Sequence, residues 1–336
     1  MYTDEDLNVA VEKGIFSADA IRQFRHLHST IKNAPAADQE NFKLLAGFND
    51  IFVVIACCLL LFSSWWMLES ITESNSFGLL VMVIISWGLA EVFIIKKQLA
   101  LPAIVLLLAF VGGVFWLCIE VFAAQAEDIS IIFATPITIL AAGLHWWRFQ
   151  VPITIAAGAA AGVGLVVAIF NHFCPDAEHW WEAMVFVCGL LTFGLAMYWD
   201  TSDINRVTRR TDVSFWLHLL AAPLIIHPVF SHLGVLDGNE NVRIMVIVIL
   251  LYLLMTSISI VIDRRALMVS SLVYVIYALA GIVETYGGVG YSFAITGVIM
   301  GAMLLLLSVY WHTVRSKLVI KLPSQIRKHI PQTQEV

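Results

Sequence analysis

The densest group of ionisable side chains in this 336-residue chain lies between two long apolar runs, although only 13% of all residues are charged. Arginine presents a planar fork of N–H donors that fits a carboxylate or a phosphate. Backbone N–H groups at the start of a helix also favour an anion. The group is therefore a candidate site for an anionic lipid headgroup or another anionic ligand. It begins at Asp200, and its candidate ligand-binding residues are Asp203, Arg206, Arg209, Arg210 and Asp212.

The same residues also have a structural interpretation. Asp203 and Arg206 are three apart, as are Arg209 and Asp212, which is the spacing of ion pairs along a helix. Asp212 or Thr211 suits the N-cap of the next helix, where an acidic side chain also meets the positive end of the helix dipole. Arginines beside an apolar run can also simply fix the orientation of that run in a membrane. The sequence leaves both interpretations of this group open, a membrane anchor and a ligand-binding site.

Ionisable side chains inside apolar runs often mark a transport path or a reaction centre in a membrane protein. His218 and Glu91 lie in such runs and are the candidates for an intramembrane polar site. The run that holds His218 also contains two prolines, and a kinked helix can line a cavity with its freed backbone. The alternative is that His218 bonds a neighbouring helix and that Glu91 reaches Lys96 and Lys97 at the membrane face.

Residues 172–179 gather two histidines, one cysteine and two carboxylates, which are ligand types for a transition metal. Their spacing matches no standard metal site, so His172 and His179 are metal candidates by residue type alone, and we expect no cofactor. The five cysteines indicate no disulfide framework, because all but Cys174 lie in apolar runs. No nucleophile elbow, phosphate loop, zinc-protease motif or haem-attachment motif occurs, so the sequence assigns no catalytic residue and gives no positive case for an enzyme.

The elements that position these residues follow from composition and from the length of the apolar runs. Hydrophobic residues make up 60% of the chain, and the charged fraction is about half of that in water-soluble domains. The net charge of −6 gives no argument for binding nucleic acid. Apolar runs long enough to cross a bilayer alternate with polar breaks, which predicts an all-α polytopic bundle. The ten predicted spans are residues 48–68, 77–95, 99–122, 129–144, 151–171, 180–199, 213–233, 243–262, 266–284 and 291–312.

The polar breaks between these spans alternate in charge. The breaks that contain Lys96-Lys97, Arg148, the arginine cluster and Arg264-Arg265 are basic, as is the C-terminal end, while the intervening breaks are acidic. The positive-inside rule therefore places both termini in the cytoplasm. It also supports an even number of spans, because both ends of the chain lie on the same side.

Three regions are expected along the chain. Residues 1–46 are a cytosolic helical segment and linker, in which Ser17 suits the N-cap of a short helix. Residues 47–314 form the transmembrane domain, and residues 315–336 form a basic cytosolic tail. Two short helices bury too little apolar surface to fold alone, so the N-terminal segment packs on itself, on the membrane domain or on a protein partner.

Small residues four apart make a flat helix face that another backbone can approach closely. Gly158 and Gly162 form such a face in the fifth predicted span, and Gly297 and Gly301 form a second one in the tenth. The functional interpretation is a moving interface of the kind that transporters use. The structural interpretation is static close packing. The basic turns also recur at regular intervals, which either duplication or evenly spaced helices explains.

Two segments resemble uncharacterised bacterial multispanning inner-membrane proteins that have a short N-terminal cytosolic region. The first is Leu7 to Phe24, with Glu12-Lys-Gly-Ile-Phe-Ser17. The second is Asp200 to Pro223, with Arg206-x-Thr-Arg-Arg-x-Asp212 and Phe215-Trp-Leu-His-Leu-Leu-Ala-Ala-Pro223. The resemblance implies a helical bundle in the bacterial inner membrane and no assigned activity.

Two functions are therefore compatible with the sequence. The first is a transporter or permease, with the kinked seventh span and the glycine face of the fifth forming the path. The second is a non-catalytic accessory, sensor or assembly protein that contacts a partner through its N-terminal segment. A deep polar cavity that reaches His218 would favour transport, whereas a solid bundle would favour the accessory role.

Overall fold

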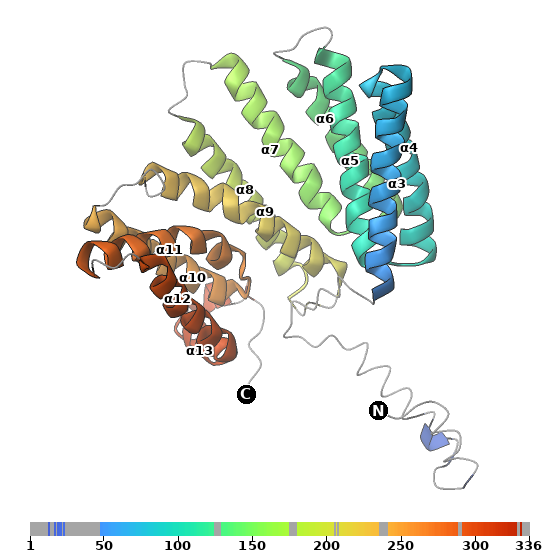
Figure 1. The fold of residues 1–336 in the computed structure, drawn as a ribbon. Coiled ribbons are helices and arrows are strands. Elements are labelled where there is room, and N and C mark those ends of the chain that lie inside the picture. The colour runs from blue at the N-terminus through green and yellow to red at the C-terminus, as the bar shows by residue number, and fades with distance from the viewer. Residues whose placement is uncertain are drawn as a thin grey trace.

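The computed structural model describes residues 13, 17, 19–21, 23, 48–123, 129–174, 180–204, 206, 208–234, 241–287, 291–327 and 330. Its described part is all-α and contains ten helices long and apolar enough to cross a membrane, which confirms the predicted fold class (Figure 1). These ten are α3 (Phe48–Thr72), α4 (Asn75–Ala90) with its continuation as the π-helix η1 (Glu91–Lys96), α5 (Ala100–Ala123), α6 (Ser130–Phe149), α7 (Ile153–Phe173), α8 (Trp181–Thr201), α9 (Arg209–His232), α10 (Val242–Ile262), α11 (Ala266–Gly287) and α12 (Ser292–Val309). The short helices α13 (Trp311–Ile320) and α14 (Ser324–Arg327) follow them.

The start of α9 corrects the predicted cap. The helix begins at Arg209, and its N-cap is Thr208, whose hydroxyl accepts from the N–H of Arg210. The prediction of Thr211 or Asp212 as the cap is therefore wrong. The physical reason is Asp203, whose carboxylate accepts from both the N–H and the hydroxyl of Thr208, at 2.8 and 2.7 Å, and so fixes Thr208 at the helix start.

Two other boundaries differ from the predicted ones. The fourth predicted span ended at residue 144, but α6 continues to Phe149. The last span ends at Val309, and α13 begins two residues later and runs through the predicted boundary between the membrane domain and the tail. Arg315 is consequently buried within α13 rather than free in a tail. In the N-terminal segment the predicted cap is present, because Ser17 Oγ accepts from the N–H of Ala20 at 3.1 Å.

The buried apolar side chains divide the spans into two units. In the N-terminal unit, α3–α7, the core lies around Leu106 and Leu107 of α5. In the C-terminal unit, α8–α13, it lies around Phe230 of α9 and Val248 of α10, and α10–α13 share a further cluster. A small cluster at the contact of α7 with α8 and α9 joins the units, and Figure 1 shows α8 and α9 between α3–α7 and α10–α13. Each unit thus has a core of its own.

Helix α9 is the central element of the described chain. In its most apolar stretch 56% of the residues are buried, against at most 39% in any other span. Its two prolines, Pro223 and Pro228, lie inside one continuous helix. Close backbone approach to α9 occurs at Gly189 of α8, where an added Cβ would lie 2.8 Å from the carbonyl carbon of Leu224 and 2.9 Å from the backbone nitrogen of Ile225.

The predicted glycine faces make no comparable contact within the described chain. An added Cβ at Gly162, Gly297 or Gly301 would meet no atom within 4 Å, and at Gly158 it would meet only the Cβ of Ala142, at 3.6 Å. The close helix contacts predicted at these positions are therefore not made in the described structure. A glycine pattern records a smooth face, but it does not determine whether a neighbour within the chain covers that face.

The four basic hairpins lie toward one end of the molecule, which we call the basic end (Figure 1). Among the described residues, each hairpin contains one non-glycine residue with a left-handed backbone: Gln98, Gln150, Arg206 and Asp263, with φ between 52° and 57°. Such residues cost of order 1 kcal/mol and persist where the surrounding structure determines their conformation. Two of these four line a cavity and the other two bind each other, as described below.

Candidate functional site

A buried ion pair joins α8 to the turn between α10 and α11. Arg264 donates from Nη2 to Asp200 Oδ1 at 2.6 Å and from Nε to Asp200 Oδ2 at 3.4 Å. The same Nη2 donates to the backbone carbonyl oxygen of Thr211 at 3.2 Å, which connects the first turn of α9 to the pair. Both charged residues are only 2% exposed. Two-point guanidinium–carboxylate contacts fix geometry as well as charge, so three segments are held in one arrangement.

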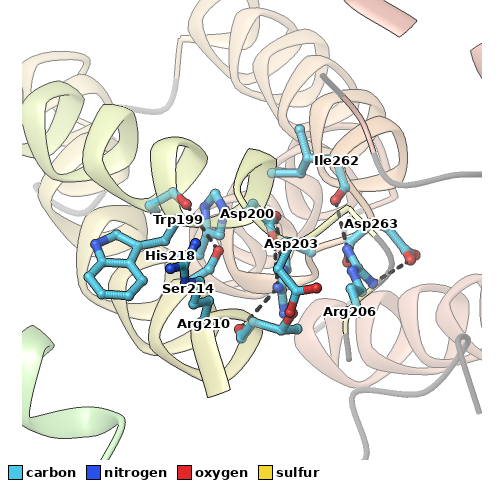
Figure 2. Close-up of polar contacts among 12 residues, drawn as sticks. Trp199, Asp200, Asp203, Arg206, Arg210, Ser214, His218, Ile262 and Asp263 are labelled. Atoms are coloured by element: carbon cyan, nitrogen blue, oxygen red, sulfur yellow. Dashed lines mark hydrogen bonds and ion pairs between the residues drawn. The ribbon is translucent and has the colours of Figure 1, made fainter. Parts of the chain in front are cut away.

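His218 lies beside this pair, one helix away. Its Nε2 is 3.6 Å from Asp200 Oδ2, which is longer than a direct hydrogen bond, and its ring packs edge-on against Phe193. The side chain is 2% exposed, and Figure 2 shows it directed toward Asp200. The structure thus brings the predicted polar residue His218 to a carboxylate, in a packed environment and not in an open channel.

A second ion pair lies next to the first at the same end of the molecule. Arg206 Nη1 donates to Asp263 Oδ2 at 2.7 Å, and Nη2 donates to the carbonyl oxygens of Ile262 and Asp263 at 3.3 Å (Figure 2). Trp311 of α13 donates from Nε1 to Asp263 Oδ1 at 2.7 Å. Arg206 therefore satisfies carbonyl groups at the C-terminal end of α10, and Asp263 ties α13 to that end.

The ionisation of Asp263 follows from these contacts. Burial alone would raise the pKa of its carboxyl group, but the positive charges of Arg206 and Arg315 and the hydrogen bonds from Trp311 and Arg206 outweigh it. The pKa of Asp263 is therefore lowered below its ordinary value. Asp263 is an anion at neutral pH, and its pair with Arg206 is intact there.

The five predicted ligand-binding residues do not all line one cavity. Arg206 is bound to Asp263, and Asp203 accepts hydrogen bonds from the N-cap residue Thr208 and from Thr211 in the first turn of α9. The ion pair predicted between Arg209 and Asp212 is not formed. Of the five, those two line a common cavity, and Arg210 is exposed without contributing to it.

The cavity lies at the junction of the two units and has a volume of about 520 Å³. Its walls come from η1, the following turn and the start of α5, from the α6–α7 turn and from the first two turns of α9. A hydrogen bond from Arg209 Nη1 to Gln150 Oε1, at 3.3 Å, crosses the junction at this point. The lining reaches Trp216 on α9 but does not include His218. The polar residues of the lining are Gln98, Gln150, Arg209 and Asp212.

The remaining predicted residues lie apart from both features. Glu91 begins the π-helix and binds Arg148 of α6 through two hydrogen bonds, at 2.9 and 2.7 Å, so its predicted reach to Lys96 and Lys97 is replaced by a contact between helices. His172 is exposed at the end of α7, and His179 lies outside the described residues. Among the described residues there is no group of three or more histidine, cysteine or acidic side chains placed to hold a metal ion.

Two buried polar groups escaped the sequence analysis. His145 is fully buried between Trp87, Phe110 and Phe149, with its Nδ1 3.3 Å from Thr154 Oγ1. It was not predicted because the fourth predicted span ended one residue before it, at residue 144. Arg264 was noted only as a basic turn residue, because nothing in its neighbours reveals that its partner lies 64 positions away.

Comparison of the chain with protein-family models, with curated proteins and with solved structures gives no match. The resemblance of its two segments to bacterial inner-membrane proteins therefore assigns no family. The candidate site rests on the geometry of the basic end alone. The chain is an integral membrane protein with multiple spans.

Proposed function

We propose that this protein is a transporter or permease of the bacterial inner membrane, and that it binds its substrate in the cavity at the basic end. One observation carries the proposal: the cavity lies between two units that each have a separate core. Transporters commonly bind substrate between two groups of helices and move one group against the other. A small joining cluster permits that motion, because few apolar contacts have to be broken.

The lining of the cavity supports a binding role. Ligand sites combine apolar walls with a small number of polar groups that fix orientation. Here Ile94, Ile104 and Ile153 contribute apolar surface, while Arg209 and Gln150 contribute polar groups. The π-helix that supplies Ile94 is itself unusual, since such segments are rare and are frequently found at functional sites.

Spin-label distance measurements test the proposal without a known substrate. In a background whose five native cysteines are replaced by alanine, labels at Lys97 and Arg210 report on the two units across the cavity. A second pair, Lys97 and Trp147, lies within the N-terminal unit and serves as the matched control. All three positions are exposed. We expect at least two distances for the first pair, with a balance that changes in liposomes under a proton gradient, and one constant distance for the control.

A single unchanged distance for both pairs would contradict transport by relative motion of the units. It would favour the second candidate, an accessory or sensor protein that acts through residues 1–46. One observation already favours that candidate: His218 is 2% exposed and the cavity does not reach it. Because the cavity does not include His218, a transport path through the cavity has to follow the junction of the two units.

A further inference from the structure

We infer that the cavity at the basic end binds a zwitterion, a molecule with an ammonium group and a carboxylate or phosphate group, which also carries an apolar chain. The inference names the class of ligand for the same cavity and rests on the proposed function for its biological role. Binding itself is measured independently of transport. Four properties of the lining support it: charge balance, an unpaired carboxylate, amide groups at the rim and an apolar wall.

The charges of the lining come from two residues of opposite sign. Arg209 and Asp212 lie three positions apart on α9, which places their Cβ atoms about 5–6 Å apart. The Asp212 carboxylate forms no hydrogen bond or ion pair with the described residues, although the charges of Arg264 and Arg209 act on it from a greater distance, and it is only partly exposed. A simple anion would be attracted by Arg209 and repelled by Asp212. A zwitterion satisfies both, and its ammonium group supplies the partner that the carboxylate lacks.

The anionic end of the ligand meets a set of donors. Arg209 already donates to Gln150 Oε1, which holds its guanidinium at the wall and leaves other N–H groups for the ligand. Gln98 and Gln150 add side-chain amides from two different hairpins. Both glutamines occupy left-handed backbone positions, with φ of 53° and 52°, where glycine would be less strained.

The opposite end of the ligand meets aromatic and apolar surface. Trp216 follows Asp212 by one helical turn and lines the same cavity, and an indole ring attracts an ammonium group. Ile94, Ile95 and Ile104 form apolar wall. The volume of about 520 Å³ is within the range of about 300–1,000 Å³ that small-molecule sites occupy. Two sources share this chemistry: a free apolar amino acid and the headgroup of an ethanolamine phospholipid.

The experiment is thermal unfolding of the full chain in detergent, followed by titration of the probes that raise its melting temperature. The zwitterionic probes are L-leucine and dihexanoylphosphatidylethanolamine. The matched single-charge probes are 4-methylpentanoate, leucinamide and dihexanoylphosphatidylglycerol. We expect at least one zwitterion to raise the melting temperature in a saturable way, and its single-charge counterparts to raise it less. A response to leucine identifies the amino-acid source, and a response to the phospholipid alone identifies the lipid source.

Variants connect the binding to the cavity. Asp212→Asn and Arg209→Gln should each weaken binding of the responding zwitterion by about tenfold or more, because each leaves one charge of the ligand without its partner. Arg210→Gln is the control, since Arg210 is exposed and does not line the cavity. Equal responses to zwitterionic and single-charge probes, no response to either zwitterion, or unchanged binding in both variants would overturn the inference. If the zwitterion binds but the two units do not move relative to each other, the inference about the ligand holds and only the proposal of transport is refuted.

Discussion

Arg264 and Asp200, 64 positions apart in the sequence, form a two-point ion pair whose side chains are only 3% and 1% exposed. The pair joins the end of α8 to the turn between α10 and α11, and the carbonyl oxygen of Thr211 connects α9 to it. We interpret the basic end of the C-terminal unit as rigid, because this pair and the neighbouring pair of Arg206 and Asp263 hold its segments together. Rigid units are what relative motion at the junction requires.

Removal of one partner of the buried pair should destabilise the protein strongly. Asp200→Asn leaves the buried guanidinium of Arg264 without a counter-charge, which costs about 3–5 kcal/mol when a buried pair is broken. We expect a much lower melting temperature in detergent by scanning fluorimetry. The control is His218→Phe, which keeps the ring volume near Phe193 and removes a side chain that makes no direct hydrogen bond.

The double variant Asp200→Leu with Arg264→Met completes this test. It removes both charges, so no uncompensated buried charge is left, and it should be more stable than Asp200→Asn alone. If the double variant were as unstable as the sum of its single variants, the pair would contribute no coupling and the rigid-unit interpretation would be wrong.

The fold was predictable from the sequence because length and apolarity alone define a span. All ten spans were found close to their observed bounds, since a helix that crosses a bilayer needs about 20 apolar residues regardless of its neighbours. The end of α6 was missed because His145 and Arg148 are polar, although both have partners: Thr154 for His145 and Glu91 for Arg148. Local polarity therefore shortened the predicted span.

The candidate site was predictable only in part, because its contacts join distant segments. The charged loop after α8 was recognised, but the sequence grouped its arginines by proximity along the chain. In the fold, Arg206 turns to Asp263 and Arg209 turns to Gln150, each more than fifty positions away. Gln98 also gives no signal in the sequence, because its place in the lining depends on how its hairpin lies relative to α9 in the fold.

Two glycines should respond in opposite ways to alanine. At Gly189 the new Cβ would lie under 3.0 Å from backbone atoms of α9, so Gly189→Ala forces the two helices apart and should cost about 1–3 kcal/mol. At Gly162 the Cβ meets nothing within 4 Å, so Gly162→Ala should be neutral or stabilising by up to about 1 kcal/mol through helix propensity. The melting temperatures of the two variants in detergent test this difference. A large loss at Gly162 would instead indicate a contact with another molecule in that sample.

The proposed orientation is tested by labelling of single cysteines. Lys97 lies at the basic end, and Glu73 lies in the α3–α4 turn at the other end of α4; both are exposed. With the basic hairpins in the cytoplasm, Glu73→Cys should react with an impermeant maleimide in spheroplasts, whereas Lys97→Cys should react only after permeabilisation. The cysteine-free parent is the control for background labelling. The reverse pattern would show that the positive-inside assignment is wrong.

The three arginines of the loop should respond differently to lysine, because each does something different. Lysine keeps the charge but lacks the planar fork of donors. Arg206→Lys should lower the melting temperature, because one ammonium group cannot reach Asp263 and both carbonyl groups at the end of α10. Arg209→Lys should leave the melting temperature nearly unchanged but weaken the binding of a zwitterion, since it loses the contact with Gln150 that orients the guanidinium. Arg210→Lys should change neither property, because that side chain is exposed.

Topology should be preserved in all three variants, since positive charge alone anchors the hairpin. If all three variants responded identically, the arginines would act only as a membrane anchor.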